Sequence, residues 1–132
     1  SFDSYKRLIE IIDSPSNAIE FCQGTFSEME DAKDGGIYEM IDYFSSRKKI
    51  LYVHFRNVSG TVPNFNEEFI NTGYVDMHKA MKIYHKNGFD SFFIDDHVPQ
   101  TFEDTEWGHR GRAFANGYIQ ALIESVTKEN KL

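Results

Sequence analysis

The chain has 132 residues, the size of one ordinary domain, and its apolar share of 40% is enough to form a buried core. Its 14 basic and 21 acidic residues give a net charge of −7, which argues against nucleic acid or an anionic membrane surface as a partner. The single cysteine, Cys22, excludes an intramolecular disulfide, and no apolar run reaches the roughly 20 residues needed to span a bilayer. We therefore expect one cytoplasmic domain over residues 1–132, with no second domain, no nucleic acid and no membrane.

The first half of the chain predicts two helices that alternate with two strands. A first helix is expected behind the capping residues Asp3 and Ser4, ending near Asp13. Its apolar positions have helical spacing and are Tyr5, Leu8, Ile9 and Ile12. The run Ala18–Cys22 predicts a buried strand. A second helical stripe follows at Ile37, Met40, Ile41 and Phe44. The apolar run Ile50–Phe55 then predicts a strand covered on both faces, as in a parallel sheet.

The second half continues the alternation after a long polar loop. Asp76 is a suitable N-cap for a helix that Gly88 ends. The apolar face of this helix is expected to consist of Met77, Ala80, Met81 and Tyr84. The run Phe89–Ile94 predicts a third strand, and a last helix is expected over about Gly108–Lys128. We expect the inner side of that helix to carry Phe114, Tyr118, Ala121 and Leu122.

This order of elements predicts an α/β fold. Strict alternation of short buried strands with helices is typical of parallel strands joined by right-handed crossovers. Both a doubly wound sheet and part of a (β/α)8 barrel fit the pattern. Because a complete barrel takes about 250 residues, barrel material of this length would be about three βα units with flanking helices. The remaining strands would then belong to sequence outside this chain.

Each predicted strand ends in residues that can bind a metal ion. Cys22 ends the first, His54 lies near the end of the second, and Asp95, Asp96 and His97 follow the third. Because parallel strands bring their carboxyl ends to one rim, we expect thiolate, imidazole and carboxylate to converge there. Taken singly, Cys22 has a structural alternative as a small buried hydrophobe, His54 as a core histidine, and the two aspartates as loop caps. Because these residues all stand at or near the carboxyl ends of three different strands, a joint site is favoured.

Basic and aromatic residues near these strand ends are further candidates. Arg56 projects on the same side of an extended chain as the strand-end histidine and can hold a carboxylate, although a surface ion pair is the alternative. Arg110 and Arg112 lie at the start of the last helix, where free backbone N–H groups favour anions. His109 stands beside a turn that contains Trp107, and its role stays open.

Five short motifs together resemble the C-terminal part of the mannonate dehydratase family, and they span nearly the whole chain. In order, they are Cys22-x-Gly24, Tyr-Val-His54-Phe-Arg56-Asn57, Tyr74-Val-Asp76-Met77, Asp96-His97-Val-Pro99, and Gly111-Arg112 with Gly117-Tyr118. The resemblance implies a xylose isomerase-like TIM barrel that dehydrates D-mannonate to 2-keto-3-deoxy-D-gluconate in hexuronate and glucuronate catabolism. It also implies a divalent ion, Mn²⁺ or Fe²⁺, a small sugar acid as substrate, and a homo-oligomer, expected to be a dimer, in the intact protein.

The resemblance assigns roles to individual residues. The implied metal ligands are Cys22, His54 and Asp96. His97 is implied as a catalytic acid or base, and the substrate-binding residues are expected to be Arg56, Asn57 and Arg112. The family takes a further histidine ligand from an earlier strand, upstream of Ser1. It also usually has a tyrosine active in proton transfer where this chain has Trp107.

An indole N–H can only donate, so Trp107 cannot act as a base. Either a neighbour such as His109 takes over, or the activity has changed. Two alternatives therefore stay open beside the dehydratase: another metal-dependent sugar isomerase or epimerase of the same barrel type, and a partial chain without catalysis. A sulfur ligand also suits zinc, so the sequence does not identify the metal. We expect the isolated chain to be inactive.

Overall fold

The computed structural model describes residues 1–129 and has an α/β architecture. Three strands form a parallel sheet, as predicted, and lie in the order β1-β2-β5; they are β1 (Ile19–Cys22), β2 (Ile50–His54) and β5 (Phe93–Ile94). The long helices are α1 (Phe2–Glu10), α3 (Gly36–Ser46), α4 (Met77–Lys86) and α5 (His109–Glu129). None of the helices within residues 1–129 is both long and apolar enough to cross a membrane.

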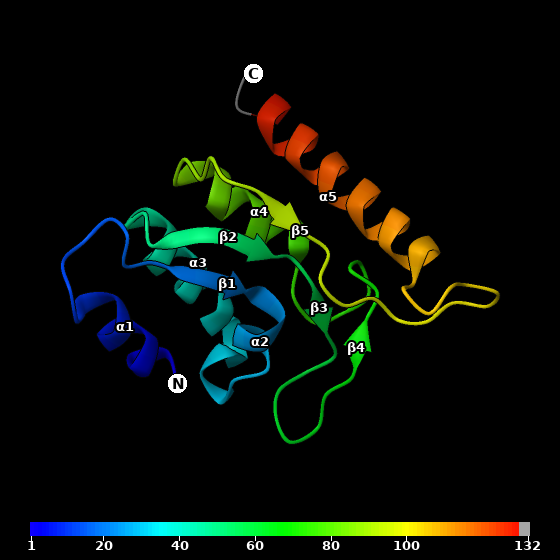
Figure 1. Cartoon of the computed structure of the whole chain (residues 1–132), viewed down its shortest axis with the longest axis horizontal. Helices are drawn as coiled ribbons and strands as arrows, with labels where there is room; N and C mark the ends of the chain where they lie inside the picture. Colours follow the sequence, from blue (N-terminus) through cyan, green and yellow to red (C-terminus); the bar gives the residue numbers. More distant parts are fainter. Residues whose placement is uncertain (130–132) are drawn as a thin grey trace.

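The helices α3 and α4 cover one face of the sheet, and the opposite face is turned toward the viewer in Figure 1. The core lies between the sheet and these two helices, where Phe21 of β1 and Val53 of β2 are fully buried. The buried faces of the two helices are the predicted ones: Ile37, Met40, Ile41, Phe44, Met77, Ala80, Met81 and Tyr84. On the other face Phe92 is 57% exposed. The sheet thus packs helices α3 and α4 on one side and leaves the other side open.

The boundaries of α4 confirm the predicted capping. The Asp76 side chain accepts a 3.0 Å hydrogen bond from the Lys79 backbone N–H, as an N-cap residue does. At the other end, Gly88 has a φ of +63° directly after the C-cap residue. This left-handed conformation suits glycine because it has no Cβ.

Four short elements lie where no regular structure was expected. They are α2 (Gln23–Ser27), the 3₁₀ helix η1 (Glu30–Gly35), β3 (Asn57–Val58) and β4 (Glu67–Glu68). The last two form an antiparallel pair beside the carboxyl end of the sheet (Figure 1). Two-residue strands carry too few positions to show an alternating pattern, so only the tertiary contact defines them.

The predicted faces of the first and last helices were partly wrong. Helix α1 ends at Glu10 rather than near Asp13 and buries Phe2 and Ile9, while Leu8 and Ile12 are exposed. Helix α5 buries Gly111, Ala115, Ile119, Leu122 and Val126, whereas Phe114 and Ala121 are exposed. Apolar residues lie on more than one side of α5. Its contacts with α4 and with the side chain of Val98 therefore decide which side of the helix is buried. The third strand is also shorter than predicted and begins at Phe93.

The start of α5 is held by the carboxylate of Asp104. It accepts hydrogen bonds from the backbone N–H groups of Arg110 and Gly111, at 3.0 and 3.1 Å. These bonds, led by the one from Arg110, lower the pKa of Asp104 from 3.8 to about 2. Because the pKa is lower in the folded chain than in the unfolded chain, the charged carboxylate stabilises the fold at pH values above about 4. This stabilisation is lost as the pH falls toward about 2 and the carboxylate takes up a proton.

We therefore expect Asp104→Ala to lower the free energy of unfolding at pH 6, because the first turn of α5 loses its acceptor. The difference from the unaltered chain should shrink as the pH falls from about 4 to about 2. Urea unfolding at several pH values measures this, with the exposed Asp90→Ala as control. A deficit of the same size throughout that range would rule out the carboxylate charge as its cause.

Candidate functional site

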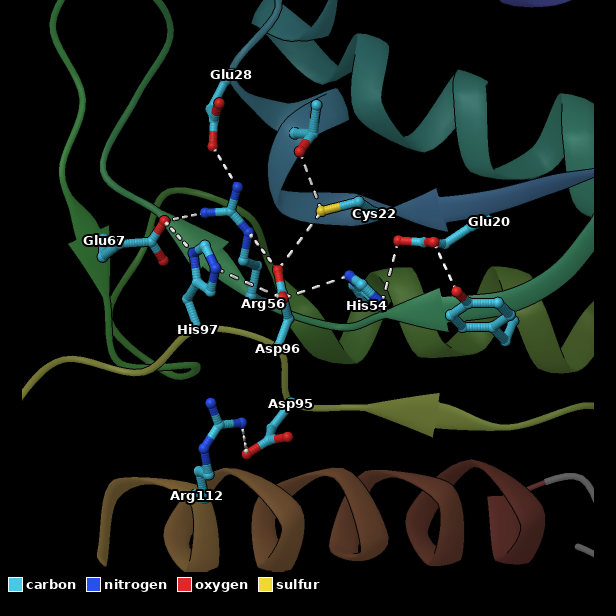
Figure 2. Close-up of polar contacts among 12 residues, drawn as sticks. Glu20, Cys22, Glu28, His54, Arg56, Glu67, Asp95, Asp96, His97 and Arg112 are labelled. Carbon is cyan, nitrogen blue, oxygen red and sulfur yellow. Dashed lines mark hydrogen bonds and ion pairs between the residues drawn. The ribbon is translucent and has the colours of Figure 1, made fainter. Parts of the chain in front are cut away.

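The side chains of Cys22, His54 and Asp96 lie together at the carboxyl end of the sheet (Figure 2). The register pairs Cys22 directly with His54, and Asp96 follows β5, which adjoins β2. Their ligand atoms all lie within 4.8 Å of one another. The Cys22 Sγ is 3.7 Å from Asp96 Oδ2, and His54 Nδ1 is 3.5 Å from Asp96 Oδ1. The expected convergence of thiol, imidazole and carboxylate is present.

This geometry fits a divalent metal ion. Ligand bonds of about 2.0–2.3 Å place neighbouring ligand atoms about 3–4 Å apart, in agreement with the two distances from the Asp96 carboxylate. All three side chains are partly buried, so bulk water competes little for their ligand atoms. One sulfur, one nitrogen and one oxygen ligand suit a transition metal better than Mg²⁺ or Ca²⁺, which bind oxygen.

The backbone at the end of β5 directs two adjacent aspartates to different partners. Asp96 has a φ of +57°, a left-handed conformation that aspartate adopts more readily than most residues. Asp96 points to the cluster with His54, whereas Asp95 points to Arg112 and binds its Nη1 at 3.1 Å (Figure 2). Of the two carboxylates that the sequence offered, the structure therefore brings Asp96 to Cys22 and His54.

Arg56 is a buried cation among carboxylates, and the alternative of a surface ion pair was wrong. The residue is 6% exposed; its Nη2 is 2.6 Å from Glu28, its Nη1 contacts Glu67, and its Nε is 3.1 Å from Asp96 Oδ2. Burial lowers the pKa of Arg56, but the Cys22 sulfur and the carboxylates of Glu67 and Glu28 outweigh burial and raise the pKa above its usual value. The guanidinium stays charged and faces protein carboxylates, so its contacts support an internal role more than the expected contact with substrate.

Gly24 makes room for this arginine. A Cβ atom at Gly24 would lie 2.2 Å from Arg56 Nε and 2.4 Å from its Cγ. The arginine cannot easily move aside, because its guanidinium is held by Glu28 and Glu67. Steric overlap with Arg56 therefore explains why a glycine stands two residues after Cys22.

Asn57 was expected to contact substrate, but its contacts support a structural role instead. The residue is 1% exposed, and its amide nitrogen donates to the backbone carbonyls of Ile70 and Val75. Its amide oxygen accepts from the backbone N–H groups of Val58 and Val75. Because all donor and acceptor positions of the amide are in use, Asn57 braces the loop around β3 and has none left for a ligand.

His97 lies beside the cluster and at the edge of a pocket. Its side chain is 63% exposed, with Nδ1 3.6 Å from Glu67 Oε1 and Nε2 3.7 Å from Asp96 Oδ1. The pocket has a volume of about 420 Å³. Its polar and aromatic lining consists of Glu67, His97, Gln100, Glu106, Trp107 and Arg112. A molecule bound in this pocket would therefore touch His97, whereas the three candidate ligands do not line it.

The remaining predicted residues differ in their distance from this pocket. Arg112 lines it, held by Asp95 and by a 2.7 Å hydrogen bond to the Trp107 carbonyl. Trp107 also lines it and is 72% exposed. His109 is exposed at the start of α5, where its Nδ1 lies 3.0 Å from Thr105 Oγ1. The structure does not bring His109 to the cluster or to this pocket, so its contacts do not support the expected catalytic role.

Three glutamates at the site were missed by the sequence reasoning. Glu28 and Glu67 bind Arg56 and come from irregular or very short elements without a sequence signal. The position of Glu20 could have been predicted, because it precedes Cys22 by two residues and so lies on the same side of β1. Its Oε1 is 3.1 Å from His54 Nε2, and its Oε2 accepts a 2.6 Å hydrogen bond from Tyr52. That hydrogen bond raises the pKa of Tyr52.

Comparisons with known proteins agree on one family. The family model described as D-mannonate dehydratase (UxuA) matches residues 1–132. The mannonate dehydratase of Lactococcus lactis subsp. lactis (strain IL1403) is 32% identical over 133 residues, covering 94% of this chain and 36% of that protein. The mannonate dehydratase of Thermotoga maritima is 27% identical over 135 residues, covering 98% of this chain and 37% of that protein.

A solved structure has the same fold. The crystal structure of mannonate dehydratase from Streptococcus suis serotype 2 matches with a TM-score of 0.90 at 22% identity, covering 99% of this chain and 38% of that one. The chain thus spans less than two fifths of the length of these relatives.

Proposed function

The chain belongs to the D-mannonate dehydratase family, and from this membership we propose that its protein is a hydro-lyase that converts D-mannonate to 2-keto-3-deoxy-D-gluconate, a step of hexuronate catabolism. The observation that carries the proposal is the convergence of Cys22, His54 and Asp96 beside the exposed His97. We also propose that the parallel sheet and its helices are about three βα units from the C-terminal part of a (β/α)8 barrel. The one-sided helix layer and the fold match support this (Figure 1).

In this proposal Cys22, His54 and Asp96 hold a divalent ion, Mn²⁺ or Fe²⁺. Such an ion supplies a positive charge that stabilises negative charge developing on the substrate. The donor set and the separations of the ligand atoms support a metal site, and the choice of manganese or iron rests on the family alone.

The side chains around the pocket suit a sugar acid. Dehydration next to a carboxylate requires a base for the proton beside it and an acid for the departing hydroxyl. His97 is exposed to the pocket and near both Glu67 and Asp96, so its ring can exchange a proton with a bound molecule. Arg112 lines the same pocket and offers a guanidinium to the substrate carboxylate.

Trp107 favours a second candidate function. It lines the same pocket as His97, at the position where the resemblance implies a tyrosine, and its indole can only donate a hydrogen bond. A metal-dependent sugar isomerase or epimerase that needs one proton-transfer residue fewer would fit this change. NMR analysis of the products formed by the full-length protein from D-mannonate separates the two functions, because the dehydratase forms a 2-keto-3-deoxy acid and the alternative forms an isomer of its substrate.

The 132-residue chain alone is expected to show no dehydratase activity, because it spans 36% of the Lactococcus lactis relative and lacks the further histidine ligand that the resemblance implies. Formation of 2-keto acid from D-mannonate with added Mn²⁺ is the measurement, with the full-length protein as positive control. Turnover by the isolated chain at an ordinary enzyme rate, about 1 s⁻¹ or more, would contradict the expectation.

A further inference from the structure

The open face of the sheet places a glutamate and a tyrosine next to the candidate ligand His54. Glu20 and Cys22 share one side of β1, and the strand register pairs Glu20 with Tyr52 and Cys22 with His54. Glu20 therefore lies diagonally across from His54 (Figure 2), and its carboxylate contacts the side chains of both His54 and Tyr52. A shift of one residue in this register would turn Glu20 to the other face.

The two ring nitrogens of His54 face different groups. Nε2 is 3.1 Å from Glu20 Oε1, whereas Nδ1 is 3.5 Å from Asp96 Oδ1, on the side of the metal cluster. A neutral imidazole carries one N–H, and a carboxylate can only accept. The contact with Glu20 therefore favours the tautomer with its hydrogen on Nε2 and a free lone pair on Nδ1.

Glu20 is itself held in place. Its second oxygen accepts the 2.6 Å hydrogen bond from the Tyr52 hydroxyl. The Tyr52 ring is stacked on Phe92 of the neighbouring chain segment, with ring centroids 5.1 Å apart and planes at 10°. The carboxylate is thus fixed from two sides, by an anchored tyrosine and by the imidazole.

We propose that Glu20, anchored by Tyr52, is a positioning residue that sets the tautomer and orientation of His54 so that Nδ1 faces the metal. The inference rests on the proposed function, since it gives His54 a metal to bind. Removing a residue that hydrogen-bonds to a metal ligand typically lowers the metal affinity about 10–100-fold.

The test uses Glu20→Ala, Glu20→Gln and Tyr52→Phe in the 132-residue chain. Matched controls are Glu10→Ala and Tyr43→Phe, because the Tyr43 hydroxyl binds Glu10 at 3.2 Å on the surface formed by α1 and α3. The first readout is the ¹⁵N chemical shifts of the His54 ring in the metal-free chain at about pH 8.5, above the ordinary pKa of histidine of about 6.5. The second is the affinity for Co²⁺, followed by its visible absorption.

We expect the unaltered chain to show its ring hydrogen on Nε2 and Glu20→Ala to show a mixture of both tautomers. The Co²⁺ affinity should fall about 10–100-fold in Glu20→Ala. It should fall less in Glu20→Gln, whose amide oxygen still accepts, and less in Tyr52→Phe, which loses only the anchor. The two controls should match the unaltered chain.

An unchanged tautomer in Glu20→Ala would overturn the inference. If Glu20→Ala does not fold, the Co²⁺ affinities of Glu20→Gln and Tyr52→Phe decide, and two affinities equal to that of the unaltered chain overturn the inference. Failure of the unaltered chain to bind Co²⁺ would count against the proposed metal site instead, while the tautomer shift would still support the positioning role of Glu20.

Discussion

Replacing His97 by asparagine in the full-length protein is expected to lower kcat by about 10²–10⁴ while leaving the metal content nearly unchanged. Asparagine keeps a similar size and can hydrogen-bond, but it cannot accept and return a proton. The His97 ring is well placed for proton transfer, since it is 63% exposed and lines the pocket. The ring also lies 3.7 Å from the Asp96 carboxylate without being one of the three clustered ligands.

Kinetics and metal analysis on one preparation distinguish the outcomes for His97. The matched control is His109→Asn, expected to keep most of its rate because His109 lies outside this pocket. If His97→Asn loses its metal, then His97 is a ligand and the proposed ligand set is wrong. If it keeps both metal and rate while His109→Asn loses rate, the proton-transfer role belongs to His109.

Replacing Arg56 by methionine should lower the free energy of unfolding by about 3–5 kcal/mol. The substitution leaves three carboxylates, those of Glu28, Glu67 and Asp96, without the cation that they share. Their side chains are 17%, 33% and 17% exposed, so water only partly replaces the lost interaction. Gly24→Ala should act in the same direction, because its Cβ would overlap the Arg56 side chain.

Urea unfolding of the 132-residue chain measures the effect of Arg56. The control is Arg7→Met on the exposed side of α1, for which a change within about 0.5 kcal/mol is expected. Equal losses in the two variants would show that the buried network contributes no more than a surface charge. A loss confined to Arg56→Met and Gly24→Ala would support the network as the cause.

Several features of the site could be predicted from the sequence because they depend on short-range patterns. The apolar runs around Phe21 and Val53 specify strands, and parallel strands bring their carboxyl ends to one edge. Convergence of Cys22, His54 and a carboxylate after the third strand was therefore expected, and the backbone after that strand selects Asp96. The buried faces of α3 and α4 followed in the same way from helical spacing.

The tertiary structure alone decided which partners these residues have. Arg56 meets Glu28 and Glu67 across 28 and 11 residues of sequence, and Asn57 meets Val75 across 18. No local periodicity encodes such contacts, which depend on where the loops and the two-residue strands come to lie. Asn57 thus braces the backbone and Arg56 is an internal cation, although the family resemblance implied that both residues bind substrate.

The last helix shows the same division. The sequence by itself determined that residues near 108–128 form a helix, because the backbone conformation follows from local propensity and capping. Which stripe it buries was decided by its neighbours, since Ala115 and Ile119 face the core while Phe114 is 47% exposed. The sequence specifies a helix when interactions between residues close in the chain are enough to form it. Which side of the helix is buried depends instead on the surface that the rest of the chain presents to that helix.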